Sequence, residues 1–169
     1  MDEHAIRSIE TAFDTFAEEL ENVRTLARKI RDGIERIDPF LQDANQHICP
    51  GCRNVCCISK HGVYSREDRV YLRALDVTPP AAVAASHETD PCPYLGADGC
   101  SIERWRRPSG CTWYFCDPLL DYIEARPGYR EFDEALREVA ELWLAMVEEF
   151  ERISTRGPKR GQATPFSAS

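Results

Sequence analysis

The sequence lacks a long hydrophobic run, and no stretch reaches the roughly 20 predominantly apolar residues that cross a bilayer. Its first four residues, Met1-Asp2-Glu3-His4, also lack the cationic start and apolar stretch of a secretory signal. We therefore expect no membrane contact and a cytoplasmic location. Because thiols stay reduced in the cytoplasm, the cysteines of this chain need an explanation other than disulfide bonds.

An excess of positive charge is also missing. The 169 residues include 21 Lys and Arg against 29 Asp and Glu, which gives a net charge of −8 and a pI of about 5.1. Binding to a nucleic-acid backbone needs a basic face, so we expect no nucleic-acid partner. The chain has no phosphate-binding loop, nucleophile elbow or paired carboxylates, and the sequence therefore assigns no enzymatic reaction.

Two segments carry the apolar periodicity of long amphipathic helices. Hydrophobic residues recur every three or four positions across residues 4–37, and Asp38-Pro39 is the expected stop. They are Ile6, Ile9, Phe13, Phe16, Leu20, Val23, Leu26, Ile30, Ile34 and Ile37. The same rhythm spans residues 129–154 and includes Trp143 and Met146, which we interpret as core positions.

Two apolar stripes of this length are expected to pack together as an antiparallel pair. The predicted fold is therefore mainly α, with long antiparallel N- and C-terminal helices flanking a cysteine-rich metal-binding core of loops and short helices at residues 49–116. With 43% hydrophobic residues, we expect one domain over residues 1–155 and a disordered tail at 156–169. The helical pair is also a candidate surface for a protein partner.

Shorter helices are expected between the long ones. Residues 65–68 read Ser-Arg-Glu-Asp, a capping-box pattern that predicts a helix through about Leu75. Prolines in the first turn predict two more helices, over 81–86 and 118–125. The sequence shows no strong strand alternation, and short strands among the cysteine loops stay open.

All eight cysteines lie between the two long helical segments. They form a first group of Cys49, Cys52, Cys56 and Cys57 and a second group of Cys92, Cys100, Cys111 and Cys116. Two residues between Cys49 and Cys52 make a tight turn that points both sulfurs at one centre. We predict all eight cysteines as metal ligands. Basic residues close to them in sequence would offset the negative charge, namely Arg53, Lys60, Arg104, Arg106 and Arg107.

Three alternatives to metal binding fit the cysteines less well. Structural disulfides fit an even count but not a chain without a secretory signal. A thioredoxin-like redox pair belongs at the start of a helix in a βαβ setting, which the sequence does not show. Inert buried cysteines do not account for eight in one cluster. His47 and His61 flank the first group and are candidate replacements for a thiolate ligand.

The spacing leaves two kinds of metal open. Zinc sites usually pair two short Cys-x2–4-Cys knuckles, and only one clear knuckle is present. The side chains of the adjacent Cys56 and Cys57 diverge and cannot easily point at one ion. We expect them either to serve one centre and a second ligand set, or to belong to a larger cluster. Scattered cysteines suit an iron–sulfur cluster better, with zinc as the alternative.

Four short segments together resemble a known family. They read Cys49-x2-Cys52-x3-Cys56-Cys57, Pro91-Cys92-Pro93-Tyr94-Leu95, Gly99-Cys100-Ser101-Ile102 and Arg107-Pro108-x2-Cys111-x4-Cys116. This pattern is similar to the YkgJ-like cysteine-cluster family, the CxxCxxCC zinc- or iron-chelating domain, although three residues instead of two precede the Cys-Cys pair. The resemblance implies metal chelation. Similar domains occur in flagellin lysine N-methylases, which favours an iron–sulfur role.

The sequence therefore predicts a metal-binding cysteine-cluster protein. An iron–sulfur cluster held by these cysteines would serve a redox, sensing or enzyme-accessory role. In the alternative, zinc staples the loops and the helical pair is a protein-interaction module without catalysis.

Overall fold

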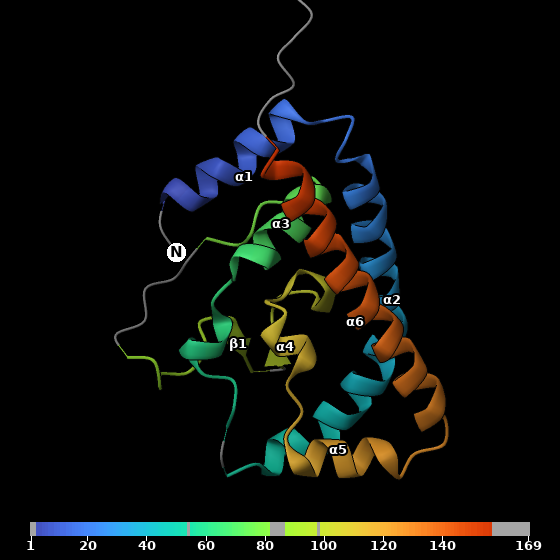
Figure 1. Cartoon of the computed structure of the whole chain (residues 1–169). Coiled ribbons are helices and arrows are strands. Elements are labelled where there is room, and N and C mark those ends of the chain that lie inside the picture. The colour runs from blue at the N-terminus through green and yellow to red at the C-terminus, as the bar shows by residue number, and fades with distance from the viewer. Residues whose placement is uncertain (1–2, 54, 82–86, 98, 157–169) are drawn as a thin grey trace, which may run out of the picture.

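The computed structural model describes residues 3–53, 55–81, 87–97 and 99–156, and these are mainly helical, as predicted (Figure 1). The α-helices are α1 (Glu3–Thr15), α2 (Glu21–Ile48), α3 (Arg66–Ala74), α4 (Gly110–Trp113), α5 (Asp117–Glu124) and α6 (Tyr129–Ser154). Three 3-10 turns, η1 (Cys49–Gly51), η2 (Ser59–Gly62) and η3 (Arg104–Arg106), lie among the cysteines. Strands β1 (Leu95–Gly96) and β2 (Gly99–Cys100) form a small antiparallel hairpin.

The two longest helices, α2 and α6, lie side by side and run in opposite directions (Figure 1). Gly33 of α2 faces Val139 of α6, and further along α2 the ring of Phe40 lies 5.7 Å from that of Phe132. Later positions in α2 therefore meet earlier positions in α6, which is the antiparallel pairing that the two apolar stripes predict. The helix predicted over 129–154 has the observed bounds of α6.

The helix predicted over residues 4–37 starts within one residue of the expected position, but it is not continuous. Residues 16–20 form a turn that separates α1 from α2. In the observed register the start of α2 lies level with the end of α6, so a straight continuation would leave the apolar stripe of α1 without a partner. The break lets α1 fold back, where Phe13 stacks on Phe150 with ring centroids 5.6 Å apart.

The expected stop at Asp38-Pro39 is also wrong, because α2 continues through Pro39 to Ile48. A proline inside a helix costs about 3 kcal/mol, since it removes a hydrogen bond and crowds the preceding turn. Packing beyond the proline outweighs this cost. Leu41 and Ala44 are fully buried in a cluster that also contains Leu119 and Ile123 of α5. The extension carries the first cysteines to the start of α5.

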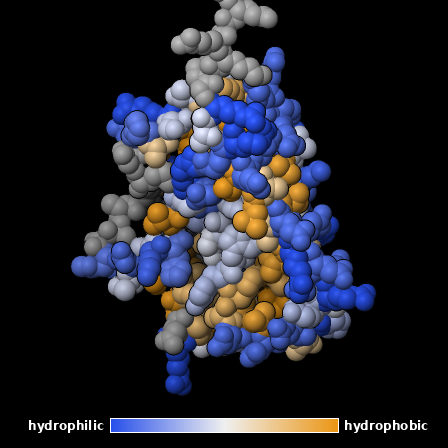
Figure 2. Space-filling model, viewed as in Figure 1, coloured by the Kyte–Doolittle hydropathy of each residue, from blue (hydrophilic) through white to orange (hydrophobic). Residues whose placement is uncertain are grey.

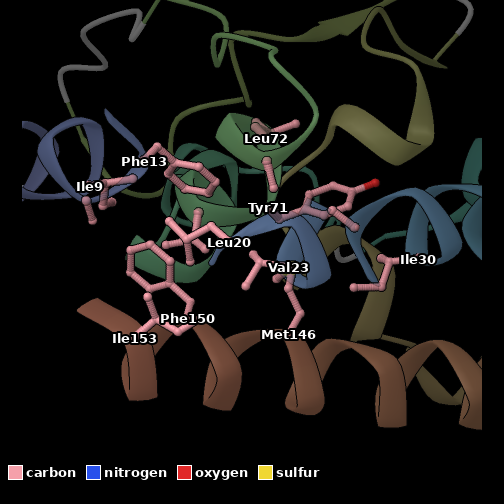
Figure 3. Packing of buried hydrophobic residues seen from close by; sticks show 14 of the residues in the cluster. Ile9, Phe13, Leu20, Val23, Ile30, Tyr71, Leu72, Met146, Phe150 and Ile153 are labelled. Carbon is pink, nitrogen blue, oxygen red and sulfur yellow. The ribbon is translucent and has the colours of Figure 1, made fainter. Parts of the chain in front are cut away.

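Two hydrophobic clusters form the interior. The larger one joins α1, α2, α3 and α6, and Figure 3 shows Phe13, Tyr71 and Phe150 packed within it. The smaller one joins α2, α5 and α6 around Phe132. Met146 is fully buried and Trp143 packs against the larger cluster, which confirms both as core positions.

Helix α3 begins and ends with identifiable caps. The predicted capping box is present, with Ser65 and Asp68 exchanging backbone and side-chain hydrogen bonds. At the other end Asp76 has a φ of 56°, and the Val77 N–H donates to the Leu72 carbonyl at 2.9 Å, as in a Schellman motif.

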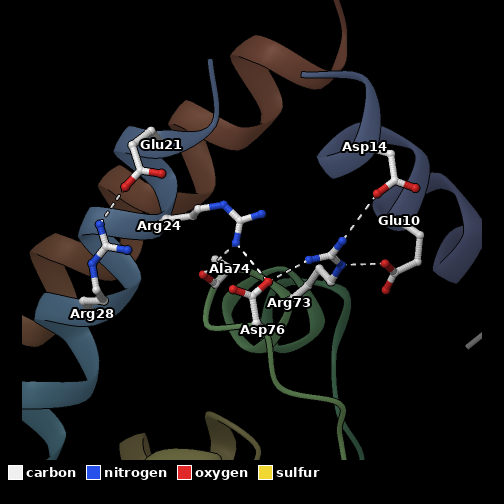
Figure 4. A network of polar contacts seen from close by, with 8 residues as sticks. All are labelled: Glu10, Asp14, Glu21, Arg24, Arg28, Arg73, Ala74 and Asp76. Atoms are coloured by element: carbon white, nitrogen blue, oxygen red, sulfur yellow. Dashed lines mark hydrogen bonds and ion pairs between the residues drawn. The ribbon is translucent and has the colours of Figure 1, made fainter. Parts of the chain in front are cut away.

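The carboxylate of Asp76 then accepts hydrogen bonds from Arg24 of α2 and Arg73 of α3 (Figure 4). Arg73 also donates to Glu10 of α1 at 2.5 Å. These hydrogen-bonded ion pairs connect α1 and α2 to the C-terminal end of α3.

Other expectations have mixed outcomes. The helix predicted over 118–125 is present as α5, shifted by one residue. The helix predicted over 81–86 and the predicted tail at 156–169 lie outside the described residues, apart from positions 81 and 156.

On the face in Figure 2, hydrophilic side chains cover most of the helical surface, and orange and pale residues gather beside α6. Within the described ranges, no helix has the length and apolarity to cross a membrane.

The close approach of α2 and α6 generates a prediction about Gly33. A Cβ atom at this position would lie 2.4 Å from Cγ2 of Val139, whose β-branched side chain is fully buried and has essentially one helical rotamer. Gly33→Ala gains about 1 kcal/mol of helix propensity, but overpacking costs about 1–3 kcal/mol. We expect a net loss of about 1 kcal/mol in the free energy of urea unfolding.

Two further variants serve as controls. In Gly110→Ala, at the first residue of α4, the new Cβ would meet nothing within 4 Å, so stability should stay the same or rise by up to about 1 kcal/mol. Combining Gly33→Ala with Val139→Ala should cost less than the sum of the two single losses, because the second truncation makes room for the first methyl group. A stabilising Gly33→Ala would contradict the close approach of the helices.

Candidate functional site

The first thiol group lies where the end of α2 meets the start of α5. Cys49 follows α2 directly, and the Cys52 N–H donates to the Cys49 carbonyl at 3.1 Å, which closes the expected tight turn. Cys116 is the N-cap residue of α5. Because α5 packs against α2, Ile48 and Cys116 both contact the smaller hydrophobic cluster. Cys116, although distant in sequence, is thereby brought to the turn that contains Cys49 and Cys52.

Electrostatic effects link Cys56 to this group. Burial raises the pKa of the Cys49 thiol, and the nearby thiols of Cys56, Cys116 and Cys52 raise it further. The pKa of Cys56 is raised by burial and then by Cys116. We call Cys49, Cys52, Cys56 and Cys116 the first thiol set.

The second thiol group is assembled by backbone pairing between two loops. The Cys92 N–H donates to the Cys57 carbonyl at 2.9 Å, and Ile58 bridges Pro91 in antiparallel fashion. The Ser59 N–H continues the pairing by donating to the Asp90 carbonyl at 2.8 Å. This short ladder places Cys57 beside Cys92.

The small hairpin and turn η2 bring in the other two cysteines. The Leu95 N–H donates to the Cys92 carbonyl at 2.9 Å, and Leu95 is paired across the hairpin with Cys100. The Cys111 thiol lies 3.7 Å from the His61 carbonyl, while a Cβ on the next residue, Gly62, would be 3.0 Å from the Cys92 sulfur. We call Cys57, Cys92, Cys100 and Cys111 the second thiol set.

Asp68 fixes the loop that precedes Cys111. This carboxylate is only 2% exposed. One of its oxygens accepts the Ser65 N–H at 2.8 Å, as part of the capping box, and the other accepts the Ser109 N–H at 2.9 Å. The helix cap of α3 therefore also positions a cysteine-bearing loop, a second task that the sequence pattern did not reveal.

The most strongly shifted thiols belong to the second set. Burial raises the pKa of Cys57 to about 11, together with the first-set thiols of Cys56 and Cys49 and then the second-set thiols of Cys92 and Cys100, so this sulfur lies near both sets. Burial, together with Cys100 and Cys92, raises the pKa of Cys111 to about 11. At neutral pH both thiols are therefore protonated, and any metal that they bind must displace their protons.

Two of the arginines predicted to offset thiolate charge act on the thiols. Arg104 is 6% exposed and forms an ion pair with Asp38 of α2. Its charge lowers the pKa of Cys49, against the larger effect of burial, and it also interacts with Cys100. Arg107 lowers the pKa of Cys111 in the same way, again against burial and neighbouring thiols. Arg104 thus faces one cysteine of each set.

The thiols are close without forming a ready-made ion site. All eight cysteines are free thiols, and each is at least partly exposed. Over residues 3–53, 55–81, 87–97 and 99–156, no group of three or more Cys, His, Asp or Glu side chains has an arrangement that would hold a metal ion. Ion binding at either set would therefore require the sulfurs to rotate toward a common point.

The two histidines have other contacts. His47 lies in the last turns of α2, where its Nδ1 is 2.7 Å from the Asp43 carbonyl and its ring stacks on Tyr122. His61 contributes its carbonyl to Cys111, and its ring lies against Tyr114. The sequence made both histidine side chains candidate ligands. The contact that the structure shows with a thiol is made by the backbone carbonyl of His61.

Asn45 is a thiol partner that the sequence reasoning missed. Its Oδ1 lies 3.7 Å from the Cys49 sulfur, one helical turn earlier. The four-residue spacing would have indicated this contact if α2 had been predicted to reach Ile48. A surface pocket of about 330 Å³ was also missed; its lining includes Asp43, Tyr122 and Arg126 but no cysteine.

Comparisons with family models, with curated proteins and with solved structures found no significant match. The resemblance to the YkgJ-like family therefore stays a prediction that depends on the cysteine motif alone.

The buried ion pair generates a prediction about stability. Asp38→Ala leaves the Arg104 charge buried without its partner, which costs about 3–5 kcal/mol for such pairs. We expect urea unfolding of Asp38→Ala to show a loss of this order, and Asp38→Ala combined with Arg104→Met to recover most of it. The matched control is Asp32→Ala, which removes an exposed pair with Arg31 and should change stability by less than about 1 kcal/mol. Equal losses in Asp38→Ala and the double variant would contradict this account.

The shifted thiols generate a prediction about alkaline pH. In the unfolded chain thiols ionise near their ordinary pKa of 9.0, whereas folded Cys57 and Cys111 keep their protons to about 11. Above pH 9 the folded state therefore binds more protons, and the free energy of unfolding should fall as the pH rises from 9 to 11. Urea unfolding of reduced, chelator-treated protein measures this. The fall should be shallower in Cys57→Ser combined with Cys111→Ser, and an unchanged slope would refute the assignment.

Proposed function

We propose that this chain is a metal-binding cysteine-cluster protein that holds an iron–sulfur centre in a redox, sensing or enzyme-accessory role. The observation that carries the proposal is the gathering of eight free thiols from separate segments into two neighbouring sets. Four sulfurs per set match the ligand number of common iron–sulfur clusters and of structural zinc sites.

The donor chemistry fits such a centre. Thiolates are the preferred ligands of iron–sulfur clusters and of zinc, and the thiols here are accessible to an incoming ion. The first-set residues Cys49, Cys52, Cys56 and Cys116 and the second-set residues Cys57, Cys92, Cys100 and Cys111 would hold it. A bound iron–sulfur cluster supplies one-electron transfer.

The protein's own residues contribute charge and shelter. Arg104 is held by Asp38 near a cysteine of each set, so its cation would offset the negative charge that four thiolates bring. The rings of Trp105 and Trp113 are partly buried against the larger hydrophobic cluster and follow Cys100 and Cys111 closely in sequence, so they would limit the access of water to a centre there. Both contributions would tune the potential of a redox centre.

Zinc is the alternative metal because the knuckle at Cys49 and Cys52 is a zinc-type element. With zinc the sets would staple the loops, and the helical pair of α2 and α6 would be the surface for a protein partner. Leu144 on α6, which is 68% accessible, would belong to that surface.

Anaerobic purification followed by elemental analysis tests the proposal. We expect iron and acid-labile sulfide bound to the chain, with a brown colour and absorbance at roughly 400 nm that is typical of thiolate-bound clusters. Stoichiometric zinc in a colourless protein would replace the iron–sulfur assignment with the zinc alternative. A protein that retains neither metal, and binds neither on reconstitution, would overturn the proposal.

Metal removal provides the internal control of this experiment. Because the metal would hold loops and not the helical seam, a chelator should reduce amide hydrogen-exchange protection in residues 49–116 more than in α2 and α6. Equal loss of protection in both regions would indicate that the metal does not act on the loops.

A further inference from the structure

The eight cysteines divide at the bond between Cys56 and Cys57. The first set lies at the junction of η1 and α5, on the side of Cys49 and Cys116. The second set is joined by the ladder from Cys57 to Cys92, by the hairpin and by turn η2. Each set has four thiols, and each contains one member of the adjacent pair.

We infer that the chain holds two four-thiolate metal centres, one at each set, with Cys56 and Cys57 as ligands of different centres. This inference rests on the proposed function and specifies its stoichiometry and ligand sets. A single centre would leave four of the eight thiols unused, or would need sulfurs from both sets to reach one point.

The local backbone separates the adjacent cysteines. The Ile58 N–H donates to the Cys56 carbonyl at 2.9 Å, which makes a three-residue γ-turn centred on Cys57. The chain then enters the ladder with Pro91 and Cys92. Cys56 therefore precedes the turn, on the side of the first set, and Cys57 is joined to the second set through its carbonyl.

Electrostatic repulsion favours separation of the Cys56 and Cys57 sulfurs when metal binds. A hydrogen bond with the Cys57 thiol lowers the pKa of Cys56, against the larger effect of burial, so the two sulfurs lie close together. Each divalent ion that binds four thiols releases four protons to solvent and leaves a four-thiolate site with a charge of −2. Only when both thiols lose their protons is this hydrogen bond lost; the two negative sulfurs then repel each other, which favours their rotation toward separate ions.

Buried positive charge lies close to thiols of both sets. Arg104 interacts with Cys49 of the first set and with Cys100 of the second. Arg107 lies near Cys111 of the second set. Two centres of charge −2 at close range repel each other, and a buried guanidinium facing both sets reduces that repulsion.

Partial loading of the wild-type protein tests the inference without any substitution. Reduced, metal-free protein receives one equivalent of Zn²⁺ under anaerobic conditions, and free thiols are then alkylated and counted by intact mass. We expect chains that carry four labels, and peptide mapping should place those four on one complete set. A distribution of only zero and eight labels, or four labels drawn from both sets, would overturn the two-centre inference. Eight labels on every chain, both after the addition of zinc and in protein labelled directly as purified, would overturn metal binding itself.

Paired substitutions provide the second measurement, read by the absorbance of thiolate-bound Co²⁺. Wild-type protein should bind two Co²⁺ ions, and Cys56→Ser or Cys57→Ser alone should each reduce this to one. Cys49→Ser combined with Cys56→Ser removes two ligands of the same set and should still leave one ion. Cys49→Ser combined with Cys57→Ser removes one ligand from each set and should leave none. Equal losses in the two double variants, with helical circular dichroism unchanged, would refute the partition.

Discussion

The seam between α2 and α6 is the constraint on which the arrangement of the thiols depends. At its centre the backbone of Gly33 lies against Val139, so the two helices approach closely and their register is fixed. From that register α2 continues through Pro39, because the residues beyond the proline are buried against α5 and α6. The end of α2 then lies at the first turn of α5, where Cys49 and Cys116 meet. Helix packing, and not the cysteine loops themselves, determines this meeting point.

The thiols gathered in this way impose an electrostatic constraint of their own. Partial burial and mutual repulsion raise the pKa values of Cys49, Cys56, Cys57 and Cys111, so the neutral thiol is favoured over the thiolate. The fold supplies only a few compensating charges, chiefly the buried Arg104. Eight thiolates without further positive charge would be strongly disfavoured at this density. The cluster is therefore consistent with two states, one with protonated thiols and one in which cations replace the protons.

Much of the framework could be predicted from sequence because it depends on local patterns. The bounds of α6, the capping box at Ser65 and the start of α5 follow from periodicity and cap residues that lie within a few positions of each other. The break after Thr15 and the passage of α2 through Pro39 could not be predicted, because both are decided by where α6 ends and where α5 packs. The spacing of the cysteines shows that they cluster in sequence, but it does not reveal how they divide into two sets. Chain order groups Cys57 with Cys49, whereas backbone pairing places it beside Cys92.

Each thiol set combines a local cluster with a residue from a distant segment. The first set joins residues 49–56 to Cys116, and the second joins Cys57 to residues 92–111. Closing such loops costs conformational entropy that grows only slowly with their length, so the larger part of the cost falls on fixing the local geometry. Here the Asp38–Arg104 ion pair, the Asp68 bridge to Ser109 and the ladder beside Cys57 already hold the segments together without an ion. Under the proposed function, an ion arriving at either set would therefore mainly rotate side chains, and most of its binding energy would remain available as affinity.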